Sequence, residues 1–464
     1  MDIIIVGNGK VGFSLAEQLV REDHNVTVVD TREDSLRRAA DQLDVMTIHG
    51  NGVSISCLKD AGAADADLLV ACTDSDEMNM ICCLTAKNMG AKYTIARIRN
   101  PEYHTSLPAL KKNLKIDMVI NPESATAVEI SRLLRFPPAA DIETFCRGRV
   151  ELMGFRLQEG DFLVGTPLRD LSSHVKKLSL LFCAADRNGE VSIPNGSFVP
   201  KVGDKLYMIG RPNSLDQFFR LLGRYAPKVK RAFLVGGGKI SLYLAAILQK
   251  SNIHLKIIEQ DMDRCRLISE QFPRAVVVHG DGTEQELLAS ERLEDFDAFI
   301  SLTDRDEENL VISLYAMQLG LKKVITKCNR QNYAGIARTV GLDSVVSPKF
   351  ITASQISHVV RGIQNSQGSV MNSLYRIADG AAEAMEFSVG PTTRCLGVPL
   401  KDLRLRPGIL IAVIVRGMQI IIPEGASTIE NGDSVILISR NSGILDLNDI
   451  YQDAAAGENG GRKA

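Results

Sequence analysis

Two glycine-rich turns are the stretches of this sequence whose residue types could do chemistry. In the first, Gly7, Gly9 and Gly12 form a G-x-G-x-x-G turn after the apolar run Asp2–Val6 and open a helical period. Such a turn lets the backbone approach a pyrophosphate, and the N–H groups at the helix start can bind its oxygens. The turn therefore predicts a dinucleotide or nucleotide site; the alternative is a tight turn that binds nothing.

A carboxylate follows at the place where it could hold a ribose. Asp30 closes the second apolar run, Val26–Val29. Its oxygens can accept hydrogen bonds from a ribose diol, and its charge would repel a 2′-phosphate. The pattern favours NAD(H) over NADP(H) but does not separate NAD(H) from ATP or ADP, since both carry an adenosine ribose and a pyrophosphate.

Further polar residues follow the strands expected at 45–48, 66–72 and 93–97. In a parallel sheet these strand ends share one edge, so the residues are expected to converge on one crevice. Arg97 is the only cation among them and the expected phosphate partner, although a surface ion pair is the alternative. Asp74 could also be a helix cap. The predicted cofactor-binding residues of this half are Gly7, Asn8, Gly9, Lys10, Val11, Asp30, Asn51, Gly52, Thr73, Asp74 and Arg97.

The elements that must position these residues alternate between strand and helix as far as the helix that starts at Asn121-Pro122. Beyond it the period changes, and Phe155–Val164, Leu178–Phe182 and Asp204–Ile209 are predicted strands. Helix 214–224 closes this small β-rich domain.

The whole plan then repeats after about 230 residues, because Arg231–Ile240 resembles Met1–Val11, and 23 positions separate both Gly7 from Asp30 and Gly236 from Glu259. Two substitutions, Ser241 for Gly12 and Lys327 for Arg97, predict a weaker or different second site; a structural copy that binds nothing is the alternative. The predicted cofactor-binding residues of this half are Gly236, Gly237, Gly238, Lys239, Ile240, Glu259, Asp281, Thr303, Asp304 and Lys327.

The sequence thus predicts an α/β fold: two Rossmann-like doubly wound domains, each followed by a small β-rich α+β domain, as a tandem duplication. The expected limits are 1–138, 141–225, 229–367 and 372–452, with a disordered tail at 453–464.

Composition narrows the class of protein. With 54 basic and 56 acidic residues there is no basic excess for nucleic acid. No apolar run approaches the roughly 18 residues that span a bilayer, and no signal peptide precedes the first strand. Nine dispersed cysteines suit reduced thiols, and no spacing predicts a metal site, so a cytoplasmic protein is expected.

The sequence resembles the TrkA family, cytoplasmic regulatory subunits of Trk-type potassium uptake systems. The residues that carry the resemblance are Ile3–Gly12, Thr27–Asp30, Ala61–Asp67 with Thr73–Asn79, Ile95–Arg99, and their second copies. The resemblance implies two RCK (KTN) units per chain and a homo-tetrameric ring beneath a membrane-embedded potassium-conducting subunit. It also implies NAD(H) or ATP/ADP as regulators, and a location at the inner face of the membrane through that partner.

The expected function is a ligand-sensing subunit that is not an enzyme, and two other functions are alternatives to it. An NAD-dependent dehydrogenase needs a proton donor or acceptor beside the nicotinamide. The small domains carry a single histidine, His174, and no catalytic constellation stands out. A pure scaffold that binds no nucleotide is the third hypothesis.

Overall fold

The computed structural model describes residues 1–103, 107–136, 139–171, 175, 177–224, 229–342, 344–364, 369–394, 396–440 and 443–452. His174 and the predicted tail lie outside them. The described residues form two compact units, one from 1–137 and 226–357 and the other from 138–225 and 358–464.

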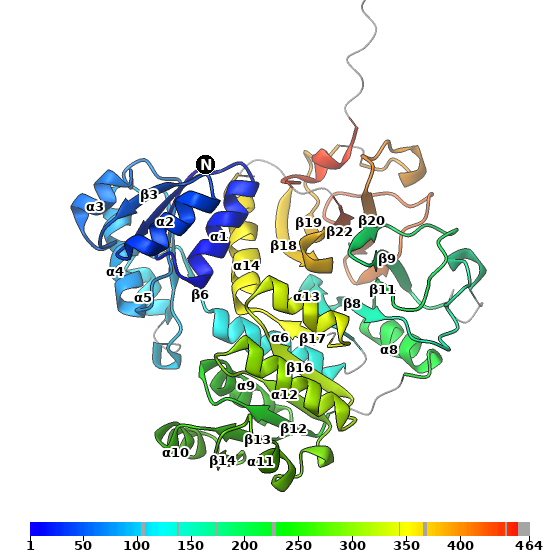
Figure 1. The fold of residues 1–464 in the computed structure, drawn as a ribbon. Helices are drawn as coiled ribbons and strands as arrows, with labels where there is room; N and C mark the ends of the chain where they lie inside the picture. The colour runs from blue at the N-terminus through cyan, green and yellow to red at the C-terminus, as the bar shows by residue number, and fades with distance from the viewer. Residues whose placement is uncertain are drawn as a thin grey trace, which may run out of the picture. The chain divides into compact units, whose positions relative to one another are not determined.

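The first unit begins with a six-stranded parallel sheet in the order β3-β2-β1-β4-β5-β6. The order reverses between β1 and β4, which is where ligands bind in open sheets of this kind. We call this part the first lobe (Figure 1). Its main elements are β1 (Asp2–Val6), α1 (Lys10–Arg21), β2 (Asn25–Asp30), α2 (Glu33–Gln42), β3 (Met46–His49), α3 (Ile55–Asp60), β4 (Leu68–Ala71), α4 (Asp76–Met89), β5 (Tyr93–Arg97), α5 (Leu107–Asn113), β6 (Met118–Ile120) and α6 (Pro122–Arg135).

The second lobe repeats this architecture strand for strand, in the order β14-β13-β12-β15-β16-β17. Its elements are β12 (Arg231–Val235), α9 (Lys239–Lys250), β13 (His254–Glu259), α10 (Met262–Gln271), β14 (Val276–His279), α11 (Gln285–Ser290), β15 (Ala298–Ser301), α12 (Asp306–Gln318), β16 (Lys323–Lys327), α13 (Gln331–Thr339), β17 (Ser344–Val346) and α14 (Pro348–Gln364).

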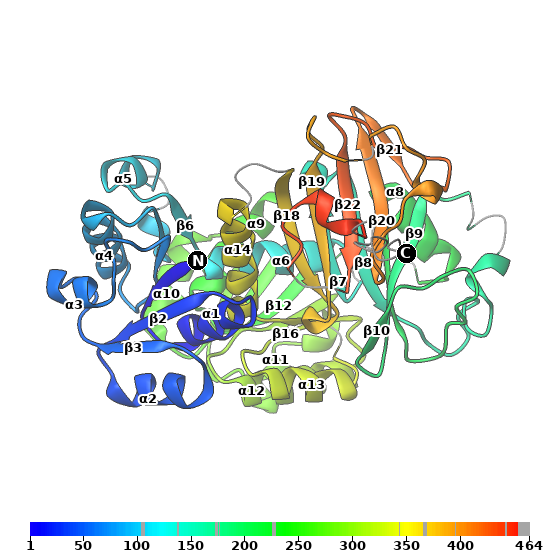
Figure 2. The same cartoon turned by 90° about the horizontal axis from the view of Figure 1, so that it is seen from above.

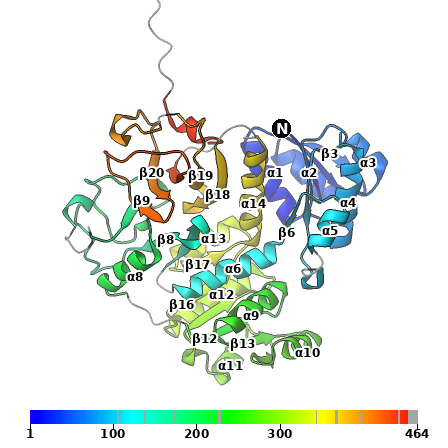
Figure 3. The same cartoon turned by 180° about the vertical axis from the view of Figure 1, so that it is seen from behind.

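Within this unit, the last helix of each lobe packs against the other lobe. Helix α6 of the first lobe lies against α9, the helix that follows the second glycine turn (Figures 1 and 3). In return, α14 lies beside α1, where the Gln18 side-chain amide donates to the Ala353 carbonyl at 3.3 Å. Each glycine-turn helix therefore packs against the opposite lobe.

The second unit contains two five-stranded antiparallel sheets of identical topology, β10-β9-β11-β8-β7 and β21-β20-β22-β19-β18. Figure 2 shows β18, β19, β22 and β20 side by side. The elements are β7 (Asp141–Phe145), β8 (Val150–Arg156), β9 (Leu180–Arg187), β10 (Glu190–Ser192), β11 (Lys205–Gly210), α8 (Pro212–Leu221), β18 (Val370–Ile377), β19 (Ala382–Ser388), β20 (Ile409–Arg416), β21 (Gln419–Ile421) and β22 (Ser434–Ser439).

The two sheets of this unit share one apolar core, which includes Leu152 and Ile209 from the first sheet and Val413 and Ile436 from the second. The predicted fold class, a tandem duplication of a parallel-sheet domain and a small β-rich domain, is confirmed.

One predicted strand is wrong. Phe155–Val164 was expected to be extended, but the strand is β8, which ends at Arg156. A turn follows, because Gly160 has a φ of +89° and the Asp161 side chain accepts the Gln158 amide proton at 2.7 Å. Among the described helices, none is long and apolar enough to cross a bilayer.

Candidate functional site

The first glycine turn is as tight as its spacing predicts. Gly7 has a φ of +97°, and a Cβ on it would lie 2.8 Å from the amide nitrogen of Thr73. A Cβ on Gly12 would lie 1.9 Å from the Gly7 carbonyl oxygen. Both positions therefore require glycine, whereas Gly9 has nothing within 4 Å of its Cβ position and leaves the start of α1 open.

Asp30 lies against this turn with a buried carboxylate. It accepts the Asn8 amide proton at 2.6 Å and the Arg32 amide proton at 2.8 Å. The Asn8 side-chain nitrogen donates to the Ser35 carbonyl at 2.7 Å, while its Oδ1 is buried and has no hydrogen-bond partner among the described residues. β1, β2 and α2 thus bring the turn, the carboxylate and one unpaired acceptor together.

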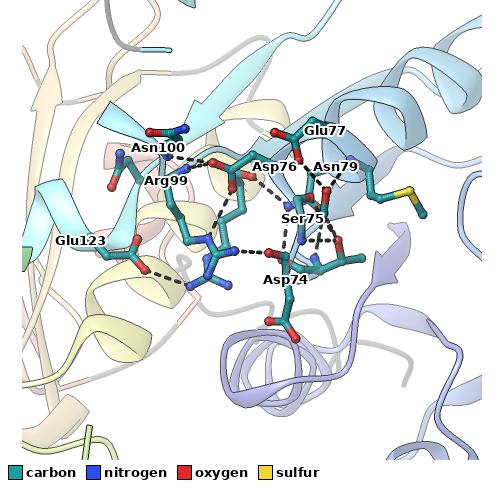
Figure 4. A network of polar contacts seen from close by, with 12 residues as sticks. Asp74, Ser75, Asp76, Glu77, Asn79, Arg99, Asn100 and Glu123 are labelled. Atoms are coloured by element: carbon teal, nitrogen blue, oxygen red, sulfur yellow. Dashed lines mark hydrogen bonds and ion pairs between the residues drawn. The ribbon is translucent and has the colours of Figure 1, made fainter. Parts of the chain in front are cut away.

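The β4 end is fixed by a buried asparagine that the sequence prediction did not single out. Asn79 in α4 accepts the Thr73 amide proton at 2.8 Å and donates to the Arg97 carbonyl at 2.9 Å. Asp76 accepts the amide protons of Arg99 at 2.8 Å and Asn100 at 2.7 Å (Figure 4). These bonds join the ends of β4 and β5. Asp74 is exposed, and Ser75, not Asp74, caps α4 by accepting the Met78 amide proton.

Arg97 is neither open to solvent nor part of a surface ion pair. Its guanidinium pairs with Glu123 of α6 at 3.1 Å, and the two side chains are 12% and 15% exposed. The Arg97 Nε and the Glu123 Oε2 are buried and have no hydrogen-bond partner among the described residues. The pair therefore keeps unused donor and acceptor capacity at the strand end.

The β3 end contributes less. The Asn51 side chain accepts the Val53 amide proton at 3.2 Å, within its own turn. Gly52 is required because a Cβ there would lie 2.1 Å from the Val6 side chain. Lys10 is exposed and Val11 is buried at the start of α1.

The second glycine turn repeats the first with compensating changes. Glu259 accepts the amide protons of Gly237 at 2.5 Å and Asp261 at 2.8 Å, as Asp30 does with Asn8 and Arg32. Gly237 replaces Asn8, and the Ile268 side chain fills the space, 2.6 Å from where a Cβ would stand. Ser241 replaces Gly12, and its hydroxyl donates to the Gly236 carbonyl. Gly238 has nothing near its Cβ position, and Lys239 and Ile240 begin α9.

The other second-lobe residues follow the same plan. Asn309 accepts the Thr303 amide proton and donates to the Lys327 carbonyl, just as Asn79 bonds Thr73 and Arg97 in the first lobe. Lys327 is buried and lies 3.3 Å from the exposed Asp304. Asp281 accepts the Thr283 amide and hydroxyl protons, which lowers the pKa of its carboxyl.

Comparison with known proteins decides the family. The TrkA-N domain family matches residues 3–122 and 232–348, and the TrkA-C domain family matches 152–223 and 384–451. The chain belongs to the TrkA family.

Relatives match nearly the whole length of the chain. The "Trk system potassium uptake protein TrkA" of Halomonas elongata is 35% identical over 97% of this chain and 99% of its own, and that of Haemophilus influenzae is 34% identical over 98% and 99%. The "TrkA homolog 2" of Methanosarcina mazei is 33% identical over 97% and 100%. Among solved structures, the GsuK RCK domain superposes with a TM-score of 0.62 at 19% identity, covering 94% of this chain and 92% of that one. A structure described as the GsuK channel bound to NAD gives the same TM-score at 20% identity, covering 94% and 76%.

An open, polar surface adjoins the first glycine turn. An open hollow of about 550 Å³ is lined by Arg32, Glu33, Asp34, Ser35 and Arg38. The Arg32 amide donates a hydrogen bond to the Asp30 carboxylate, and the Ser35 hydroxyl donates one to the Asn8 carbonyl, so the hollow adjoins the glycine turn. Among the described residues no group of three His, Cys, Asp or Glu side chains could hold a metal ion.

Sequence reasoning missed Asn79, Asp76, Glu123 and their second-lobe partners as site residues. A signal existed for two of them, because Asp76 and Asn79 recur as Asp306 and Asn309 in the repeat. Repeated polar residues that are buried in both copies indicate a shared structural task. No comparable signal pointed to Glu123, since lysine stands at the equivalent position 349.

Proposed function

We propose that this TrkA chain is the regulatory subunit of a potassium uptake system, which binds NAD(H) or ATP/ADP and gates a membrane-embedded potassium-conducting subunit. The observation that carries the proposal is the repeated glycine turn whose second residue donates its amide proton to the acidic side chain at the next strand end, Asp30 or Glu259. The relatives named potassium uptake proteins supply the transport context.

The geometry supports the roles that we assign to these residues. The N–H groups around Gly9 and Lys10 would hold the pyrophosphate at the start of α1. Asp30 keeps lone pairs for a ribose diol, and the hollow beside Arg32 offers room for the base. Arg97 would meet a phosphate through its unpartnered Nε. The second-lobe residues would form a weaker or different site.

Occupancy would act by shifting populations. A nucleotide that binds two conformations of the assembly unequally biases them, and only the difference in affinity does work. A coupling of about 1–3 kcal/mol changes the ratio five- to 150-fold. We place the assembly, a homo-tetramer, in the cytoplasm, attached to the membrane through its partner.

An NAD-dependent dehydrogenase is the alternative function. Its test is hydride transfer from NADH to a panel of carbonyl compounds, and turnover that depends on Asp30 would refute a purely regulatory role. The predicted domain limits are part of the proposal, and limited proteolysis followed by mass spectrometry would test them.

The main experiment measures binding and flux together. Calorimetry with NADH, ADP and ATP on the full chain is expected to give heat with at least one of them. Rubidium flux into vesicles that contain the Trk membrane subunit is expected to depend on that nucleotide. Asp41→Asn, an exposed carboxylate on α2, is the matched control for Asp30→Asn. If none of the three nucleotides gives heat, nucleotide binding is refuted and the scaffold hypothesis is favoured instead.

A further inference from the structure

A tyrosine hydroxyl joins the two lobes of the first unit by hydrogen bonds. Tyr243, on α9 of the second lobe, accepts a hydrogen bond from the Asn121 side-chain amide at 2.8 Å and donates to the Arg99 carbonyl at 3.0 Å. Asn121 also caps α6, since its Oδ1 accepts the Ser124 amide proton at 2.8 Å. One side chain of the second lobe thus holds both the start of α6 and the segment after β5.

The hydroxyl is suited to donate at neutral pH. Burial raises the pKa of Tyr243, with the acidic side chains of Glu123 and Asp76 adding to the effect and the Asn121 bond opposing it. The proton therefore stays on the oxygen and bonds the Arg99 carbonyl. A half-buried hydroxyl with both a donor and an acceptor partner restricts the distance between the groups that it joins.

The two segments that Tyr243 holds, the start of α6 and the residues after β5, adjoin Arg97, on the side of the first site where a phosphate is expected. Glu123 lies on the first turn of α6, next to the capped end, and pairs with Arg97. Arg99 binds Asp76 at 3.3 Å through its Nε and also contacts the Asp74 carbonyl, as Figure 4 shows. Tyr243 therefore acts on the Arg97–Glu123 pair through both of its hydrogen bonds. The bond with Asn121 holds the start of α6, which carries Glu123, and the bond with Arg99 holds the segment that continues from Arg97.

The equivalent place in the other half is built differently. Position 14 of α1, which corresponds to Tyr243, is a serine, and Ser347 stands where Asn121 does. The Ser347 hydroxyl is buried and finds no hydrogen-bond partner among the described residues. The lobe-to-lobe link through a tyrosine is thus specific to the first site.

We propose that Tyr243 is a positioning residue for the phosphate side of the first nucleotide site, supplied by the second lobe, so that the first lobe alone holds an incomplete site. The inference rests on the proposed nucleotide-binding function. Its ligand class is a nucleotide that bears a diphosphate, because Arg97 is the group whose placement Tyr243 controls.

The test compares ADP with adenosine on the full chain. Tyr243→Phe keeps the ring and removes both hydrogen bonds. Calorimetry is expected to show ADP binding weakened roughly five- to tenfold, as the loss of about one hydrogen bond's net contribution implies, with adenosine binding within twofold. Asp30→Asn identifies the binding event that belongs to the first lobe. Tyr315→Phe, which removes a hydroxyl with no hydrogen bond among the described residues, is expected to change neither.

A double-mutant cycle separates positioning from general packing. In an Arg97→Ala background, Tyr243→Phe is expected to weaken ADP binding no further. Unchanged ADP affinity, equal losses for ADP and adenosine, or full additivity with Arg97→Ala would each overturn the inference. If Tyr243→Phe does not fold, Asn121→Ser keeps an α6 cap and cuts the same link, with the same outcomes expected. A wild-type chain that binds neither ligand overturns the proposed function itself.

Discussion

Replacing Asp30 by asparagine tests the ribose contact at nearly constant shape. The carboxylate now accepts two backbone amide protons, from Asn8 at 2.6 Å and Arg32 at 2.8 Å, and its side chain is 7% exposed. Asparagine retains one acceptor oxygen and presents an NH2 group to the other amide. One buried N–H then loses its partner, which costs about 1–3 kcal/mol of folding free energy.

The effect on binding is separate and has its own size. A hydrogen bond from a ribose hydroxyl to a charged carboxylate contributes about 1.5–3 kcal/mol. At about 1.4 kcal/mol for each tenfold change, nucleotide affinity at the first site should fall roughly 10- to 150-fold. Removing the charge also removes the repulsion of a 2′-phosphate, so NADPH should gain on NADH in relative affinity.

Calorimetry with NADH and ADP gives the affinities, and thermal unfolding in the same buffer gives the stability. Glu259→Gln makes the same change at the second turn, where the Glu259 carboxylate bonds Gly237 and Asp261. It should leave the first binding event unchanged. If Asp30→Asn lowers the melting temperature but alters neither affinity nor the NADPH-to-NADH ratio, the carboxylate serves only the turn and the ribose assignment is refuted.

Three further predictions concern other parts of the chain. Gly12→Ser should abolish first-site binding in calorimetry, because its Cβ would lie 1.9 Å from the Gly7 carbonyl oxygen, whereas Ser241→Gly should be tolerated; wild-type affinity in Gly12→Ser would contradict this. Burial raises the pKa of Cys72 to about 12. Its alkylation in the native state at pH 8, followed by mass spectrometry, should therefore be slower than in the unfolded chain by a factor on the order of a hundred or more, and equal rates would disprove this. Burial lowers the pKa of His358 in the folded chain, with a smaller effect from Arg361. As the pH falls, the unfolded state therefore binds this proton first, and the stability of the fold should decrease below a pH of about 6.5. His358→Gln should flatten that part of a plot of melting temperature against pH, and an unchanged plot would contradict the prediction.

The sequence predicted what local patterns determine. The glycine turn, the apolar strands and the acid at the next strand end are encoded within 30 residues, and the repeat confirmed their spacing. Tyr93–Arg97 was predicted at its observed limits because a short apolar run is bounded by clear turn signals. The cysteines that the structure describes are free and buried.

Contacts between segments that lie far apart in the sequence could not be predicted from sequence patterns. Tyr243 and Asn121 are 122 positions apart, and no periodicity connects them. The partner of Arg97 was missed because Glu123 has the ordinary pattern of an acidic residue in a helix's first turn. The strand prediction for Phe155–Val164 failed because its apolar residues continue past Arg156 into a turn, where Leu163 is buried without strand pairing.

The common apolar core of the two small domains makes each half of the chain dependent on the other. Leu152 and Ile209 are covered partly by residues such as Val413 and Ile436, which come from the other copy. A chain cut between the copies would leave each fragment with an exposed apolar surface that the other fragment covers in the intact chain. Because one chain carries both copies, the two halves of this core are always present together, whereas two separate chains would have to meet in solution to form it.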